Sequence, residues 1–155
     1  MKTGSRYLTF LLLPLLLTFA VPVFASSIDE SLPDAQTLIR LETQAQEANP
    51  REQCFLYAAL VHTMTEIAGK QMLDGNIDQA SATLRKVEHY ALLIHLGLAR
   101  DTKRLKNTEL LMHHTTYRLN EYLHQASGED QATLKSTLKE LDHVHDELLA
   151  QVFNH

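Results

Sequence analysis

The chain has 155 residues, with 14 Lys and Arg against 19 Asp and Glu, so its formal net charge is −5 with histidine neutral. This acidity disfavours a nucleic-acid partner, because binding to nucleic acid depends on basic side chains that neutralise phosphates. The sequence has one cysteine, which excludes an internal disulfide, and it lacks phosphate-binding glycine-rich loops and a Gly-x-Ser-x-Gly motif. We therefore expect a protein without catalytic activity whose fold is stabilised by packing.

The first 25 residues have the three parts of a secretory signal peptide. Lys2 and Arg6 precede an apolar run, and Val23 and Ala25 occupy the two positions that govern a cleavage site. An uncleaved membrane anchor is the alternative, but the run is short for a span of ~20 apolar residues. The pattern predicts cleavage after Ala25 and export to a periplasm or to the extracellular medium.

Behind the signal peptide we expect a polar leader over residues 26–33 and a single helical domain over residues 34–155. Loss of Lys2 and Arg6 leaves 12 basic residues against 19 acidic ones, a net charge of −7. That charge disfavours attachment of the mature chain to an anionic membrane surface. Cys54 is interpreted as a small buried residue, with a link between two copies as the alternative.

Two helices are predicted on either side of Asn49-Pro50, the first over residues 34–48 and the second from Pro50 to Leu73. A residue before proline avoids the helical region, whereas Asn as N-cap and Pro as first residue favour a helix start. Gly75 suits the left-handed conformation at a helix end. The second helix has a broad apolar face, typical of burial against several neighbours, formed by Leu56, Tyr57, Leu60, Val61, Met64, Ile67, Ala68 and Met72.

A third helix is predicted from Asn76, which we expect to act as its N-cap. Its apolar residues follow a seven-residue repeat, typical of a helix lying along a partner. The repeat consists of Ile77, Ala80, Leu84, Val87, Ala91, Ile94 and Leu98. The same count continues, with a weaker apolar pattern, through Asp101, Leu105, Thr108, Met112, Thr115, Leu119, Tyr122 and Ala126. Because no proline interrupts the count, the sequence favours one helix from Asn76 to Ala126. A break between Gly97 and Thr102 is the alternative.

A last helix is predicted over residues 129–153. Its core face consists of Leu134, Leu138, Leu141, Leu148 and Val152, with His145 at the remaining position. No stretch alternates with the period of a strand. The fold class is therefore all-α, either a three- or four-helix antiparallel bundle or an array of helical hairpins.

The stretch from Met64 to Leu92 has part of the residue pattern of a known helical repeat. Met64, Ile67 and Ala68 match the repeat's Trp, Leu and Gly, Gly75 falls in its turn, and Ala80 and Leu84 match its second-helix Ala and Phe. Gln71 and Leu92 depart from its Tyr and Pro, and no second copy follows at the repeat's spacing. The stretch resembles one degenerate tetratricopeptide (TPR-like) hairpin, which implies a module that binds protein.

The chain has nine histidines, but no two share a helix face at a spacing of three or four. Glu121 with His124, and Glu140 with His143, reproduce the Glu-x-x-His element of di-iron helical bundles. Both histidines point away from the predicted core faces. We therefore favour solvated ion pairs over a metal site.

His145 interrupts a face of leucines and has two interpretations. It is either a histidine at the core edge bonded to a nearby acceptor, or an axial haem ligand with Met64 as the second ligand. Methionine inside a core usually serves as packing, which favours the first interpretation.

Histidine protonation would move the mature chain from −7 to +2 if all nine side chains became charged. We accordingly expect association to depend on pH between about 7.5 and 5.5. The function predicted from sequence is an exported protein-binding or self-associating helical module without a cofactor. A periplasmic metal- or haem-binding four-helix bundle is the alternative.

Overall fold

The computed structural model describes residue 33 and residues 35–98, 103–128 and 130–154. The predicted signal peptide and all but the last residue of the predicted leader lie outside these ranges. The described residues form helices and no strands, which confirms the all-α prediction. The helices are α1 (Ala35–Glu47), α2 (Pro50–Leu73), α3 (Ile77–Gly97), α4 (Leu105–Gln125) and α5 (Asp130–Asn154).

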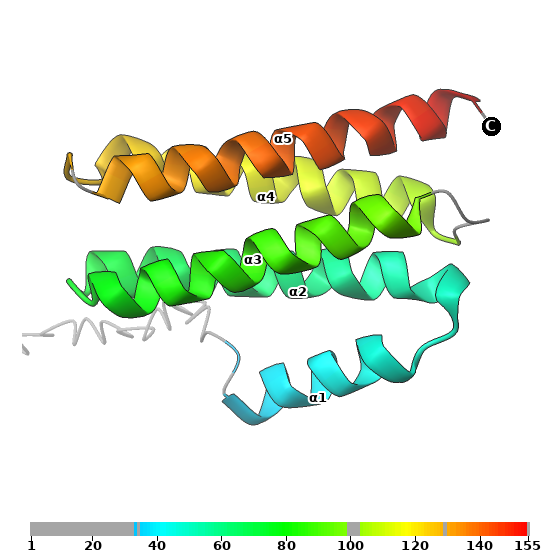
Figure 1. The fold of residues 1–155 in the computed structure, drawn as a ribbon, viewed down its shortest axis with the longest axis horizontal. Helices are drawn as coiled ribbons and strands as arrows, with labels where there is room; N and C mark the ends of the chain where they lie inside the picture. The colour runs from blue at the N-terminus through cyan, green and yellow to red at the C-terminus, as the bar shows by residue number, and fades with distance from the viewer. Residues whose placement is uncertain (1–32, 34, 99–102, 129, 155) are drawn as a thin grey trace, which may run out of the picture. The chain divides into compact units, whose positions relative to one another are not determined.

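The four longer helices form two antiparallel hairpins, α2–α3 and α4–α5, that pack side by side (Figure 1). Helix α2 lies beside α4, α3 lies beside α5, and α1 packs against α2. Within the described ranges, no helix is both long enough and apolar enough to cross a bilayer.

The contact between α2 and α4 is parallel. Near its start, the Lys103 N–H donates to the Arg51 carbonyl at 2.8 Å. Further along, Arg118 binds Glu66, which precedes it by 52 residues. The same separation relates Lys103 to Arg51, so the two helices run in one direction with a constant offset.

The contact between α3 and α5 repeats this geometry. His95 binds Glu147 across 52 residues, and the Gln151 amide donates to the Leu98 carbonyl across 53 residues. The second hairpin therefore lies on the first in the same orientation, helix on corresponding helix.

Local signals explain both ends of α2. Asn49 caps α2, since its Oδ1 accepts a hydrogen bond from the Arg51 N–H at 3.1 Å. Gly75 turns the chain with a φ of 77°, which a residue without Cβ adopts at little cost. Asn76 is the N-cap residue of α3, as predicted, but its side chain makes no capping hydrogen bond.

The favoured continuous helix from residue 76 to 126 is also wrong, because α3 ends at Gly97 and α4 begins at Leu105. One helix of that length would extend ~75 Å at ~1.5 Å per residue, far beyond the other helices. Reversal of the chain allows both halves to bury their apolar faces. Arg104, with a left-handed φ of 61°, directly precedes α4.

The seven-residue count nevertheless predicts the buried face of both helices. In α3, Leu84 and Val87 are fully buried, while Arg85 and Lys86 are exposed. Beyond the break, the count falls on buried residues of α4, which are Thr108, Met112, Thr115, Leu119 and Tyr122. In α5, Leu134, Leu141 and Leu148 are fully buried as expected.

Cys54 lies in the core, as predicted, with 1% of its surface exposed. Burial raises the pKa of its thiol to about 12. The thiolate that would attack a second sulfur is therefore absent near neutral pH.

Candidate functional site

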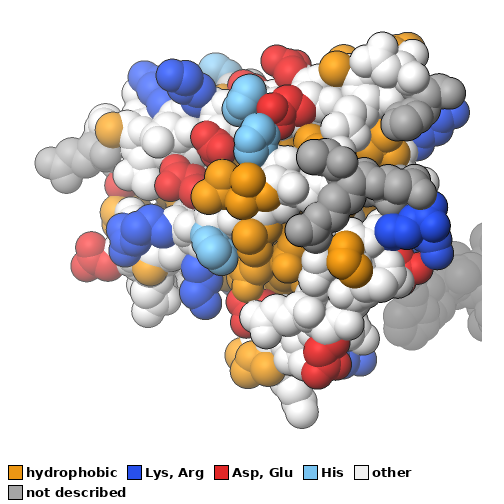
Figure 2. Space-filling model, turned by 45° about the vertical axis from the view of Figure 1, so that its right-hand side comes forward, with side chains coloured by type: hydrophobic (Ala, Val, Ile, Leu, Met, Phe, Trp, Pro, Cys, Tyr) orange, Lys and Arg blue, Asp and Glu red, His pale blue; other side chains and the backbone are white. Residues whose placement is uncertain are grey.

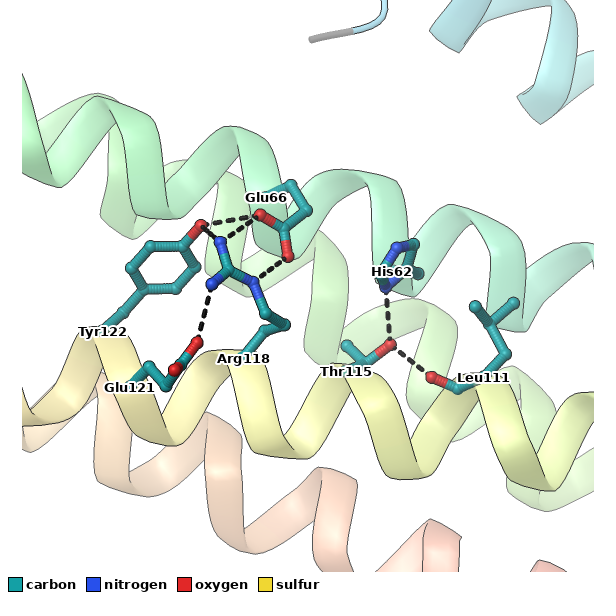
Figure 3. Close-up of polar contacts among 7 residues, drawn as sticks. All are labelled: His62, Glu66, Leu111, Thr115, Arg118, Glu121 and Tyr122. Carbon is teal, nitrogen blue, oxygen red and sulfur yellow. Dashed lines mark hydrogen bonds and ion pairs between the residues drawn. The ribbon is translucent and has the colours of Figure 1, made fainter. Parts of the chain in front are cut away.

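A polar network joins α2 to α4 (Figure 3). The Arg118 guanidinium grips the Glu66 carboxylate with two bonds, Nε to Oε1 at 2.8 Å and Nη2 to Oε2 at 3.0 Å. The Tyr122 hydroxyl donates to Glu66 Oε2 at 2.7 Å, and Arg118 Nη1 donates to Glu121 at 2.6 Å. Such a bidentate pair fixes both orientation and register.

The charge states in this network are firmly set. Burial by itself would raise the pKa of Glu66, but hydrogen bonds from Arg118 and Tyr122 and the charge of Arg118 lower it below its ordinary value. Burial and the contact with Glu66 raise the pKa of Tyr122 to about 12. The Glu66 carboxylate is therefore ionised and the Tyr122 phenol neutral near pH 7. We call this network of Glu66, Arg118, Glu121 and Tyr122 the clamp, because it holds α2 against α4.

Gly69 makes room for this clamp. A Cβ on Gly69 would overlap the ring of Tyr122, so only glycine allows that ring to lie directly on α2. The ring can then place its hydroxyl on Glu66.

A second polar contact involves His62, which lies one turn before Glu66 on α2 (Figure 3). The Thr115 hydroxyl donates to the Leu111 carbonyl at 2.7 Å and so accepts from His62 Nδ1 at 3.0 Å. The His62 ring also lies 5.5 Å from the ring of His114, centroid to centroid. His114 also lines an apolar groove.

The groove lies between the first halves of α2 and α4 and has a volume of about 430 Å³. It is lined by Phe55, Asn107, Leu110, Leu111 and His114. Leu110 is 65% exposed. Two turns further along α4, Tyr117 is 59% exposed. An apolar groove with a large apolar side chain open to solvent is a candidate binding surface.

The rim of this groove is basic. The Arg104 guanidinium lies 3.4 Å above the centre of the Phe55 ring, a cation–π contact that leaves its charge exposed. Lys106, which precedes the lining residue Asn107 in the chain, is also exposed, and the described residues provide no ion-pair partner for either cation. The nearby carboxylates are already engaged, Glu52 by Lys103 and Glu109 by His145.

Histidines meet across two further helix contacts. His113 of α4 lies 5.2 Å from His145 of α5, and His95 of α3 lies 5.8 Å from His143 of α5, centroid to centroid. The second pair also includes Glu147. Figure 2 shows histidine side chains beside acidic ones, next to a patch of apolar side chains.

The Glu-x-x-His residues predicted from sequence are not gathered into one site. Glu121 binds Arg118, His124 is exposed, and Glu140 is half-buried on α5. His143 belongs instead to a group with His95 and Glu147, which is the one three-residue group of potential metal ligands among the described residues.

The two residues considered for haem lie in different surroundings. Met64 is fully buried in α2. The His145 side chain is 16% exposed at the α4–α5 contact, where its Nε2 binds Glu109 at 3.0 Å. This bond corresponds to the core-edge interpretation of His145.

Comparisons with known proteins found no matching family model, no matching curated protein and no matching solved structure.

Proposed function

We propose that the protein is an exported module that binds another protein through the α2–α4 groove. The partner segment presents apolar side chains flanked by carboxylates. The observation that carries the proposal is the open apolar groove at Leu110, with the exposed Arg104 guanidinium stacked on its lining residue Phe55.

Charge complementarity favours a partner segment that carries carboxylates. The chain as a whole is acidic, yet the cations at this rim are available and the neighbouring carboxylates are engaged. Apolar side chains in the groove would supply affinity, and a positive rim favours approach by an acidic segment. The side-by-side hairpins support the same function, since stacked helical hairpins form extended binding surfaces in repeat proteins. The TPR-like pattern of the first hairpin points in this direction as well.

Selection of helical peptides from a displayed library on the immobilised protein tests the proposal. Enriched sequences should combine apolar residues with Asp and Glu. Leu110→Ser should weaken their binding about tenfold, which corresponds to about 1.4 kcal/mol. Leu73→Ser is the matched control, because Leu73 is 64% exposed and does not line the groove.

Two outcomes would overturn the groove as the docking site. One is the enrichment of basic peptides, and the other is equal loss of binding in the Leu110 and Leu73 variants. Charge reversal gives an independent check, since Lys106→Glu should weaken binding while Lys139→Glu on α5 should not. If instead a second copy of the chain fills the groove, Leu110→Ser would change the sedimentation of the protein alone.

Export is a separate part of the proposal, supported by the pattern of residues 1–25. Intact-mass measurement on protein from its native host should give a chain that starts at Ser26. A full-length mass in the membrane fraction would contradict it.

A further inference from the structure

His95, His143 and Glu147 place three ligand atoms within 4.8 Å of one another on the α3–α5 contact. His95 Nδ1 lies 2.6 Å from Glu147 Oε2, and His143 Nε2 lies 3.6 Å from Glu147 Oε1. The group is separate from the α2–α4 groove and does not depend on the function proposed for it.

Rigid elements position these side chains. His143 and Glu147 are four residues apart on α5 and so share one helix face. His95 comes from α3, which runs parallel to α5 at this level and is held there by the bond between Gln151 and the Leu98 carbonyl. The two helices therefore bring the three potential ligands together at one level of the bundle.

The spacing suits a bound ion. Ligand atoms at ~2.0–2.2 Å from a tetrahedral zinc ion lie about 3.3–3.5 Å from one another. The 3.6 Å between His143 and Glu147 is close to that value. The shorter bond between His95 and Glu147 contains a proton that a metal ion would replace, since ligating imidazole must be deprotonated on the nitrogen that binds.

The chemistry of the three ligand atoms indicates which metal ions the group would bind. Two imidazoles and one carboxylate suit Zn²⁺, Cu²⁺ or Ni²⁺ rather than Mg²⁺ or Ca²⁺, which prefer oxygen ligands. The side chains of His95, His143 and Glu147 are 40%, 61% and 31% exposed, so water can reach the remaining coordination positions. A hollow of about 440 Å³, lined partly by His95 and Glu147, adjoins the group.

We propose that His95, His143 and Glu147 form a binding site for one divalent transition-metal ion, with three protein ligands and open positions filled by water. Its affinity should follow the general order for such ligands, with Cu²⁺ bound more tightly than Zn²⁺ and no binding of Mg²⁺. Binding should weaken at acidic pH, where protons compete for the imidazoles.

Calorimetric titration of the full mature chain with ZnCl₂ tests the site. The wild type should bind one Zn²⁺, and His95→Ala and His143→Ala should each weaken binding more than about tenfold because a ligand is lost. Glu147→Gln should also weaken it. His124→Ala is the matched control, an exposed histidine on α4 outside the group, and MgCl₂ should give no binding heat.

Urea unfolding of each variant separates loss of the site from loss of the fold. The proposal is overturned if a folded His95→Ala variant binds Zn²⁺ like the wild type. It is overturned equally if His124→Ala or His113→Ala weakens binding as much as His95→Ala does, since that result would mean diffuse binding to many histidines.

Discussion

At the scale of single residues, the α2–α4 contact depends on a glycine, Gly69, which has no side chain to obstruct the neighbouring helix. Gly69 allows the Tyr122 ring to lie against α2. Tyr122 then donates a hydrogen bond to the Glu66 carboxylate, which also binds Arg118. The contact is therefore specific in shape as well as in charge.

Gly69→Ala tests this dependence. Alanine is the better helix former by about 1 kcal/mol, yet overlap with the Tyr122 ring should make the variant less stable by about 1–3 kcal/mol in urea unfolding. Gly97→Ala is the control, because a Cβ there meets no atom within 4 Å. In a Tyr122→Ala background the penalty of Gly69→Ala should disappear, and a penalty of unchanged size would contradict the overlap.

Glu66→Gln tests the electrostatics of the clamp. The pKa of Glu66 is lowered in the folded state, so its charge stabilises the fold above its unfolded pKa of ~4.3, and this contribution is lost as pH falls toward the folded value. The difference in free energy of unfolding between wild type and variant should therefore shrink between about pH 6 and 3. A difference that stays constant over this range would mean that Glu66 is not held in its charged form.

The residues of the α3–α5 group were predicted only in part from sequence. His143 was a candidate, but with Glu140 as its partner rather than Glu147, four residues on. His95 and Glu147 are 52 residues apart, and no local spacing reveals that α3 and α5 run parallel with this offset. The spacing of His143 and Glu147 was the one signal of the site within a single helix.

At the scale of helices, the boundaries of α2 were predicted correctly, because the sequence has proline and glycine as local signals there. Asn49-Pro50 and Gly75 delimit α2 as expected. The interruption after Gly97 was the less favoured alternative, because no proline marks it and the seven-residue count stays in phase on both sides. Burial in the finished bundle, which the sequence does not display, favours the break.

Leu84→Ala tests the register of α3. Leu84 is fully buried, so its truncation should cost about 2–5 kcal/mol, whereas Lys86→Ala on the exposed face should change stability by less than about 0.5 kcal/mol. Urea unfolding measures both. Similar losses in the two variants would mean that α3 presents a different face to the core.

At the scale of the whole molecule, the two packed hairpins form two different surfaces, and each surface combines one helix from each hairpin. The α2–α4 side has an apolar groove with a basic rim, and the α3–α5 side carries the histidine and carboxylate ligands. The sequence shows nine histidines and a broad apolar helix face, but only the tertiary arrangement brings His95 and His143 together beside Glu147. The dependence of association on pH stays a prediction.

The central claim is that a partner docks in the α2–α4 groove. Hydrogen–deuterium exchange, measured with and without a selected apolar and acidic peptide, tests it most directly. Exchange should slow only in the first halves of α2 and α4, around Phe55 and Leu110, with α3 and α5 unchanged. Protection centred on α3 and α5, or no protection at a saturating peptide concentration, would contradict it.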